Sequence, residues 1–210
     1  SPTYVNLRGN LGTPGPLVKP AIPGVFEDHP FKAAKAVGKN KTGNRLALAR
    51  WMTRSDHPLT ARVWVNRVWK HHFGRGIVSS LDNFGKLGAA PTHPELLDWM
   101  AIELVENKWS TKHLHRLICT STAYRQSSLN TKTAATKDPD NVWLSRMRMR
   151  RLDAEELHDG LLAISGRLNA RLGGKPDDVQ VRERGYVTGK PGEGGWRRSV
   201  YIRQRRIHMM

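Results

Sequence analysis

Residues 62–78, RVWVNRVWKHHFGRGIV, decide the fold class of this chain. Apolar side chains recur in this stretch at helical spacing up to Phe73, and Gly74 follows directly. Glycine just past the last periodic residue is the usual left-handed end of a helix. Thr60 can cap the other end. The stretch therefore predicts a helix that runs from Thr60 to Phe73.

The two adjacent histidines of this stretch invite a metal-site interpretation, which helical geometry argues against. His71 and His72 diverge by about 100° on a helix, so one metal ion within the helix cannot join them. His72 falls on the apolar stripe near Val65, which predicts a buried, hydrogen-bonded core histidine. His71 lies at the border of the stripe, so it joins Asn66 and Arg67 as a candidate for contacts outside the fold.

Helical patterns continue on both sides of this segment. The run NRLALARWMTRSD (44–56) predicts a helix of about three turns. The run THPELLDWMAIELVENKW (92–109) predicts a second helix with a capping box, in which Thr92 is the N-cap and Glu95 is at N3. Ser110 is placed to cap the next helix.

The following residues give weaker patterns. A polar spacer, SSLNTKTAATKD (127–138), is followed by a predicted short helix that begins at Asp138 or Asp140 and includes 141–146. The run RMRMRR (146–151) is an extended link or a helix end.

A second capping box begins the last predicted helix. Asp153 and Glu156 form it, and apolar residues then recur on one face to Leu172, before the glycine pair at 173–174. This spacing predicts one long helix. Residues 199–204 are strand-like.

These elements predict a mainly α fold, with about six helices in one orthogonal-type bundle. Residues 1–44 contain six prolines, which exclude a long helix and predict an extended, Pro/Gly-rich arm. Residues 45–173 form the predicted helical core. Residues 174–210 are a basic loop and strand tail with a short β element, predicted to be a truncated part of the same domain.

The composition points to anionic partners. The 210 residues contain 35 Lys and Arg against 18 Asp and Glu, a net charge of +17. Such a balance favours polyanions, although an acidic partner domain in a larger protein would explain it equally well. Only one cysteine is present, Cys119, so a disulfide within the chain and CxxC zinc, redox or haem motifs are excluded. No apolar run approaches the roughly 18 residues of a membrane span, and the N-terminus does not match a signal peptide.

Few residues indicate catalysis. Cys119 lies on a predicted helix with no activating residue beside it in sequence, and the chain has no GxSxG motif. His93 and Glu95 near a helix start, together with His71, are the candidates for acid–base chemistry. Nine histidines occur without an i,i+4 pair, so no metal site and no cofactor are predicted for this chain.

Arginine clusters give the clearest functional signal, because planar guanidinium groups bind phosphate, sulfate and carboxylate with two parallel hydrogen bonds. An open alternative is pairing within the chain, as between Arg150 and Glu156. The anion-binding candidates are Arg62, Arg67, Arg125, Arg148, Arg150, Arg198 and Arg203. Phosphate-loop and nucleic-acid recognition motifs are absent, so nucleic acid is the least favoured partner.

Three stretches carry a family resemblance that covers nearly the whole chain: residues 56–128, which begin DHPLTARVWVNRVWKHHFGRGIV, DPDNVWLSRMRMRRLDAEELHDGLLAISGRL (138–168) and RGNLGTPGPLVKPAIPGVF (8–26). They closely resemble a planctomycete domain of unknown function, typically found C-terminally in large exported proteins that also carry cytochrome-c-like domains. The resemblance implies an exported, periplasmic or cell-surface location. It also implies other domains of the same polypeptide as partners, with haem in those domains. It supplies no catalytic residues.

Three functional hypotheses follow. The first is an accessory interaction module of an exported, cytochrome-c-linked protein, docking a partner domain or an anionic polymer such as a polysaccharide. The second is an enzyme acting on acidic or sulfated polysaccharide, with His71 or His93 in its site and Arg62, Arg67 and Arg125 as anion clamps. The third is a nucleic-acid-binding domain, against which an exported location argues. The sequence does not decide whether the chain is an enzyme.

Overall fold

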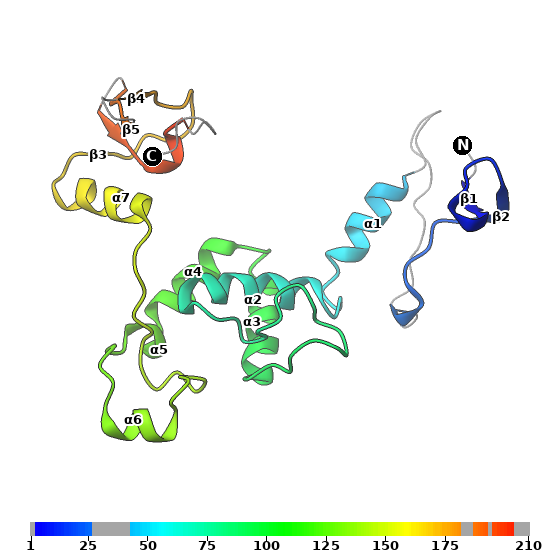
Figure 1. Cartoon of the computed structure of the whole chain (residues 1–210), viewed down its shortest axis with the longest axis horizontal. Coiled ribbons are helices and arrows are strands. Elements are labelled where there is room, and N and C mark those ends of the chain that lie inside the picture. Colours follow the sequence, from blue (N-terminus) through cyan, green and yellow to red (C-terminus); the bar gives the residue numbers. More distant parts are fainter. Residues whose placement is uncertain (1–2, 27–42, 182–186, 193–194, 204–210) are drawn as a thin grey trace. The chain divides into compact units, whose positions relative to one another are not determined.

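The computed structural model describes residues 3–26, 43–181, 187–192 and 195–203 (Figure 1). The chain divides into two compact units, Ser1–Arg148 and Met149–Met210. The sequence predicted an arm over residues 1–44, a helical core over residues 45–173 and a tail that belongs to the same domain as the core. Within the second unit, the helix that follows residue 153 packs against the C-terminal tail.

The mainly α class is confirmed: the described residues contain seven α-helices and only short strands. Within the first unit, α2 packs against both α3 and α4 (Figure 1). The helices of this unit are α1 (Asn44–Met52), α2 (Thr60–Phe73), α3 (Pro94–Glu106), α4 (Thr111–Thr120), α5 (Thr122–Arg125) and α6 (Lys132–Lys137).

The core of the first unit forms where α2, α3 and α4 meet. Val65, Leu104 and Leu114, one from each helix, are completely buried. Each such side chain contributes about 1.5–3 kcal/mol relative to an exposed one. The full cluster contains Val65, Val68, Trp69, Phe73, Ile77, Val78, Leu97, Met100, Leu104, Leu114 and Ile118.

Helix α2 has the predicted bounds but not the predicted N-terminal cap. Gly74 adopts φ +78° after Phe73, and its N–H donates to the Lys70 carbonyl at 2.7 Å, as the glycine signal predicted. At the other end, Thr60 does not act as the cap. His57 replaces it, because its Nδ1 accepts from the backbone N–H of Thr60 at 3.1 Å.

Asn66 fixes the turn that follows α2. It is fully buried, and its side-chain amide forms two 2.9 Å hydrogen bonds, donating to the carbonyl and accepting from the N–H of Val78. A Cβ at Gly76 would lie 2.5 Å from the Val78 carbonyl oxygen, so only glycine fits there. The hypothesis that Asn66 contacts something outside the fold is therefore wrong.

The caps of α3 and α4 differ in how well the sequence predicted them. Thr92 is not the N-cap of α3, which begins at Pro94 with His93 at the cap position and no side-chain cap. Proline at the first position has no N–H that needs a partner, which removes part of the need for a capping group. Ser110 caps α4 as predicted, accepting from the N–H of His113 at 3.3 Å.

Residues 127–148 depart from the predicted pattern. The expected polar spacer contains α6, and the expected helix over 141–146 is absent. The Asp138 carboxylate accepts from the backbone N–H groups of Val142 at 2.7 Å and Trp143 at 3.1 Å, which holds a turn instead. Burial alone would raise the pKa of Asp138, but these bonds and those from Ser145 lower it below its ordinary value.

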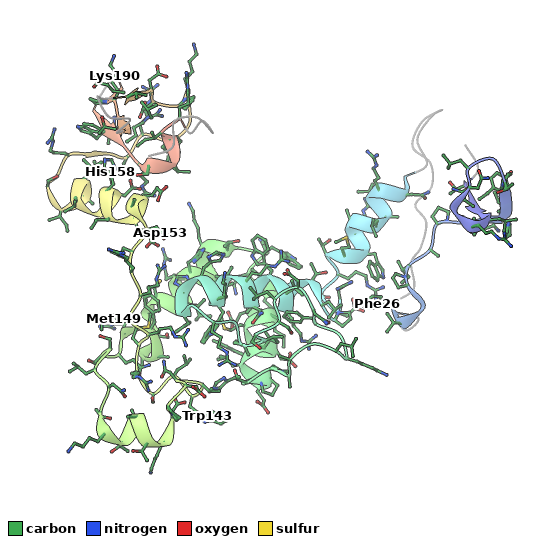
Figure 2. The ribbon with its side chains drawn as sticks, in the orientation of Figure 1. Phe26, Trp143, Met149, Asp153, His158 and Lys190 are labelled. Carbon is green, nitrogen blue, oxygen red and sulfur yellow. The ribbon has the colours of Figure 1, made fainter. Side chains whose placement is uncertain are left out.

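The N-terminal region contains no α-helix in residues 3–26, in keeping with its prolines. Strands β1 (Thr3–Asn6) and β2 (Pro14–Val18) pair antiparallel, with the 3-10 turn η1 (Leu7–Gly9) between them. A second 3-10 turn, η2 (Gly24–Phe26), follows. The ring of Phe26, labelled in Figure 2, lies 5.4 Å from that of Trp51 in an edge-on contact.

The second unit combines one helix with short strands. The elements are α7 (Ala154–Ile164), β3 (Leu168–Asn169), β4 (Val179–Val181), β5 (Val187–Gly189), β6 (Trp196–Arg197) and the 3-10 turn η4 (Ser199–Tyr201). Strand β3 pairs with β6 in parallel, and β4 pairs with β5 antiparallel. The predicted strand over 199–204 is a 3-10 turn over its first three residues, and residues 204–210 lie outside the described part.

Helix α7 begins as predicted but ends early. Asp153 and Glu156 form the expected capping box, and the Asp153 N–H donates to the Glu156 carboxylate at 3.3 Å. The helix stops at Ile164 rather than Leu172, because Gly166 takes a left-handed conformation at φ +68°.

Arg197 joins the segments of the second unit. Its guanidinium donates to both Asp177 carboxylate oxygens, at 2.8 and 3.0 Å. It also donates to the carbonyls of Gly173 at 2.7 Å and Lys175 at 2.6 Å. Its remaining face lies 4.7 Å from the Tyr201 ring centroid. The hydrogen bonds to the Asp177 carboxylate raise the pKa of Arg197, so the guanidinium stays positively charged.

Candidate functional site

A small cavity of about 30 Å³ lies in the first unit, beside the C-terminal end of α2. Three segments enclose it: the turn after α2, the start of α3, and the turn 141–148. Trp143, labelled in Figure 2, belongs to the last of these. The lining residues are Trp69, Phe73, Arg75, Gly76, Thr92, His93, Asn141, Val142, Leu144 and Arg148.

Two stacked rings of α2 contribute the aromatic part of the lining. Trp69 and Phe73 are one helical turn apart, and their ring centroids lie 4.1 Å apart with an interplanar angle of 25°. Both are almost completely buried in the core. This part of the cavity is therefore apolar and held in place by the core.

Arg75 and Arg148 give the cavity its positive charge. Both are exposed, and within the described part of the chain neither has an acidic partner. The side chain of Arg148 passes close to Gly74, where a Cβ would lie 3.4 Å from its Cδ. The C-terminal carbonyls of α2 carry partial negative charge, which favours cations at this end. The sequence predicted Arg148 as an anion ligand and missed Arg75.

His93 also lines this cavity. Its Nδ1 lies 2.9 Å from the Thr92 hydroxyl oxygen, which in turn lies 3.3 Å from the Ile77 carbonyl oxygen. The Trp143 ring meets the imidazole edge-on, with centroids 5.5 Å apart. These contacts orient the ring of His93.

The size and charge of the cavity suit one small anionic group. A volume of about 30 Å³ admits one or two polar atoms, such as the oxygens of a carboxylate or sulfate whose remainder stays outside. Two guanidinium groups and an imidazole can bind a carboxylate or sulfate there by charge-assisted hydrogen bonds. A whole sugar ring would not fit.

The other anion-binding candidates of the first unit lie elsewhere. Arg62 forms an ion pair with Asp98, and its hydrogen bond lowers the pKa of that carboxyl. Arg67 lies 3.7 Å from Asp82 in a largely exposed pair. Arg125 is exposed and does not line the cavity.

Two of the three candidates in the second unit are paired within the chain. Arg150 donates to Glu156 at 2.9 Å and lowers its pKa, which is the alternative that the sequence left open. Arg203 lies 3.0 Å from Asp178. Arg198 is exposed, with no carboxylate partner among the described residues.

The acid–base candidates do not come together. His71 and Glu95 are both exposed, and neither lines the cavity that contains His93. Of all the candidate residues, the structure brings only His93 and Arg148 to one site.

A Ser–His–Asp cluster occurs in the second unit, but its geometry is structural. The Ser199 hydroxyl donates to Asp159 Oδ1 at 2.7 Å, and His158 Nδ1 lies 3.2 Å from the same hydroxyl. In a hydrolase triad the imidazole lies between serine and carboxylate. Here the serine hydroxyl donates directly to the carboxylate, with no imidazole between them. Ser199 is also only 3 % exposed. These bonds hold η4 against α7.

His72 also differs from its prediction. It is half-buried rather than buried, and its Nε2 lies 2.7 Å from Nδ1 of His115. The sequence shows no activating residue beside Cys119, but in the structure its Sγ lies 3.9 Å from His72 Nδ1. Packing of α2 against α4 joins residues 47 positions apart, which no local pattern contains.

Two further observations concern the described residues only. They contain no group of three or more His, Cys, Asp or Glu side chains that could hold a metal ion. Their helices include none with the length and apolar character needed to span a membrane.

Comparison with known proteins gives one family. Neither a curated protein nor a solved structure matches the chain. A family model described as PSD1, a protein of unknown function (DUF1553), matches residues 44–210. This match includes α1 to α7 and all three segments that enclose the cavity, and the chain therefore belongs to this family of unknown function.

Proposed function

We propose that this chain is an accessory module that binds an anionic group of a polymer at the cavity lined by Arg75, Arg148 and His93. One observation carries the proposal: two arginines without acidic partners in the described residues meet at a preformed cavity. Arg62 and Arg150, by contrast, are engaged by carboxylates of the chain.

The polymer class that fits best is a carboxylated or sulfated polysaccharide. The oxygens of its substituents can enter the cavity, and guanidinium groups bind such oxyanions with good geometry. The net charge of +17 adds long-range attraction for a polyanion. A polymer whose backbone stays outside, with one substituent in the cavity, satisfies both the volume and the charge.

The setting of the module is a further part of the proposal. We infer it from the resemblance of the sequence motifs to planctomycete proteins that are exported and carry cytochrome-c-like domains, whereas the family match adds only membership of a family of unknown function. In such a protein the haem belongs to other domains, and those domains are partners of this module. The complete reading frame tests this directly: a signal peptide and a CxxCH motif are expected, and the absence of both contradicts the setting.

Binding of heparin, used as a sulfated probe, tests the cavity. The variants Arg75→Gln and Arg148→Gln should each weaken binding about tenfold, because each removes a charge-assisted contact. Arg198→Gln is the matched control, since it removes the same charge from an exposed position outside the cavity. Measurement at graded salt gives the affinity of each variant. Equal losses in all three variants would show that charge alone, and not the cavity, binds the polymer.

A second candidate function is hydrolysis or elimination on the same class of polymer, with His93 as the acid–base group. The orientation of His93 by Thr92 and Trp143 favours it. Under this hypothesis the unaltered protein turns over a sulfated glycan, and His93→Gln abolishes turnover while retaining binding. Binding without turnover in the unaltered protein favours the accessory module.

A further inference from the structure

The contact between α2 and α4 brings together a thiol and two imidazoles outside the proposed anion site. Cys119 Sγ lies 3.9 Å from Nδ1 of His72, and Nε2 of His72 lies 2.7 Å from Nδ1 of His115. The Tyr124 ring meets His72 edge-on, with centroids 5.4 Å apart. The cysteine is exposed, so a reagent can reach its sulfur.

The short contact between the two imidazoles restricts their protonation, and either ring nitrogen can carry the proton between them. Two nitrogens 2.7 Å apart share one proton, since two N–H groups cannot point at each other. With that proton on His72 Nε2, the Nδ1 of His72 is an acceptor that faces the thiol. His115 then holds the tautomer of His72, the task that a carboxylate performs in nucleophile–base–orienter sites.

We propose that Cys119 is a nucleophilic thiol that undergoes exchange with a disulfide of a partner molecule, with His72 as its base and His115 as the orienting group. The thiol proton passes to His72 Nδ1, and the thiolate attacks one sulfur of the disulfide. A new S–S bond forms as the old one breaks. The departing thiolate takes the proton from His72, so no further oxidant or reductant is needed.

The cysteine count decides which product forms. Cys119 is the only cysteine in the 210 residues, so no second thiol of this sequence can resolve the mixed disulfide. The product is therefore a covalent link to the partner rather than a disulfide within the chain. This favours attachment or capture over the cycle of a dithiol reductase. The inference is independent of the anion cavity, whose lining contains none of these residues.

A neutral disulfide, 2,2′-dithiodipyridine, tests the site without bias from the charge of the protein. The single cysteine assigns all released pyridinethione to one residue. At pH 7 the folded chain should react about tenfold faster than the same chain unfolded in urea, because an adjacent imidazole accepts the thiol proton. His72→Gln should remove most of this acceleration, and His115→Gln about half of it.

His113→Gln is the control on the same helix, because glutamine keeps a donor for Glu103, the partner of His113. It should react like the unaltered chain, and circular dichroism should show equal helix content in all variants. An unchanged rate in His72→Gln overturns the proposal, as does a folded chain no faster than the unfolded one. A rate that falls equally in His113→Gln also overturns it, because general loosening of α4 would then explain the effect.

Discussion

Different interactions stabilise the interior of each of the two units. The first has a cluster of eleven buried apolar residues shared by α2, α3, α4 and the turn after α2. In the described part of the second unit, the buried apolar residues are only Leu162 and Ile202. Buried polar groups take their place there, with Arg197 7 % and Ser199 3 % exposed, both hydrogen-bonded within the unit.

This difference predicts different responses to mutation. Apolar packing is spread over many contacts, so the loss of one side chain costs a fraction of the total. A buried charge that loses its partners leaves several polar groups unsatisfied at once. The second unit should therefore depend on a few residues in an all-or-none manner, and the first should weaken gradually.

The largest effect should follow substitution of Arg197. Arg197→Lys keeps one positive charge for Asp177 but cannot also donate to the Gly173 and Lys175 carbonyls. Amide hydrogen exchange, resolved by peptide, should show loss of protection across the second unit with α2 to α4 unchanged. Arg198→Lys, at the exposed neighbour, is the control. Retained protection in Arg197→Lys would mean that the apolar contacts of this unit suffice.

An intermediate effect is expected in the core of the first unit. Leu104→Ala should lower the free energy of unfolding by about 2–5 kcal/mol, since it opens a cavity at a completely buried position. Ile102→Ala on the exposed side of α3 should change it by no more than about 0.5 kcal/mol. Denaturant unfolding of this unit measures both. Similar losses in the two variants would place the core elsewhere.

The smallest effect concerns pH and the turn that borders the cavity. The pKa of Asp138 is lowered in the folded chain. Its ionised carboxylate therefore stabilises the turn at pH values above 3.8, the ordinary pKa of the group. That contribution is lost as the pH falls through and below this value. NMR should show the amide signals of Val142 and Trp143 shifting in this acid range. Asp138→Asn should abolish the titration of these signals, and a titration that persists in this variant assigns it to another group.

Features encoded by neighbouring residues could be predicted from the sequence. The end of α2 at Gly74, the Ser110 cap and the capping box of Asp153 with Glu156 each depend on residues within one helical turn. The hydrogen bonds and conformations that define them involve no distant partner.

Features that depend on competing or distant contacts could not be predicted. Asp138 carries a helix-start signal, but its carboxylate instead binds three backbone N–H groups in a turn. The partnership of His72 with Cys119 and the meeting of Arg75 with Arg148 depend on how segments pack, so no spacing in the sequence contains them. Net charge pointed to an anion site without separating paired arginines from unpaired ones.

The two hydrogen bonds between the Asn66 side chain and the Val78 backbone have a consequence for protein engineering. Because Asn66 binds only backbone atoms of Val78, and Gly76 leaves no space between them, the number of residues from 66 to 78 is fixed. A single inserted residue would move Val78 out of reach and leave a buried amide unsatisfied. Labels and fusion points therefore belong near the exposed Leu87, in the loop that follows, and not within residues 66–78.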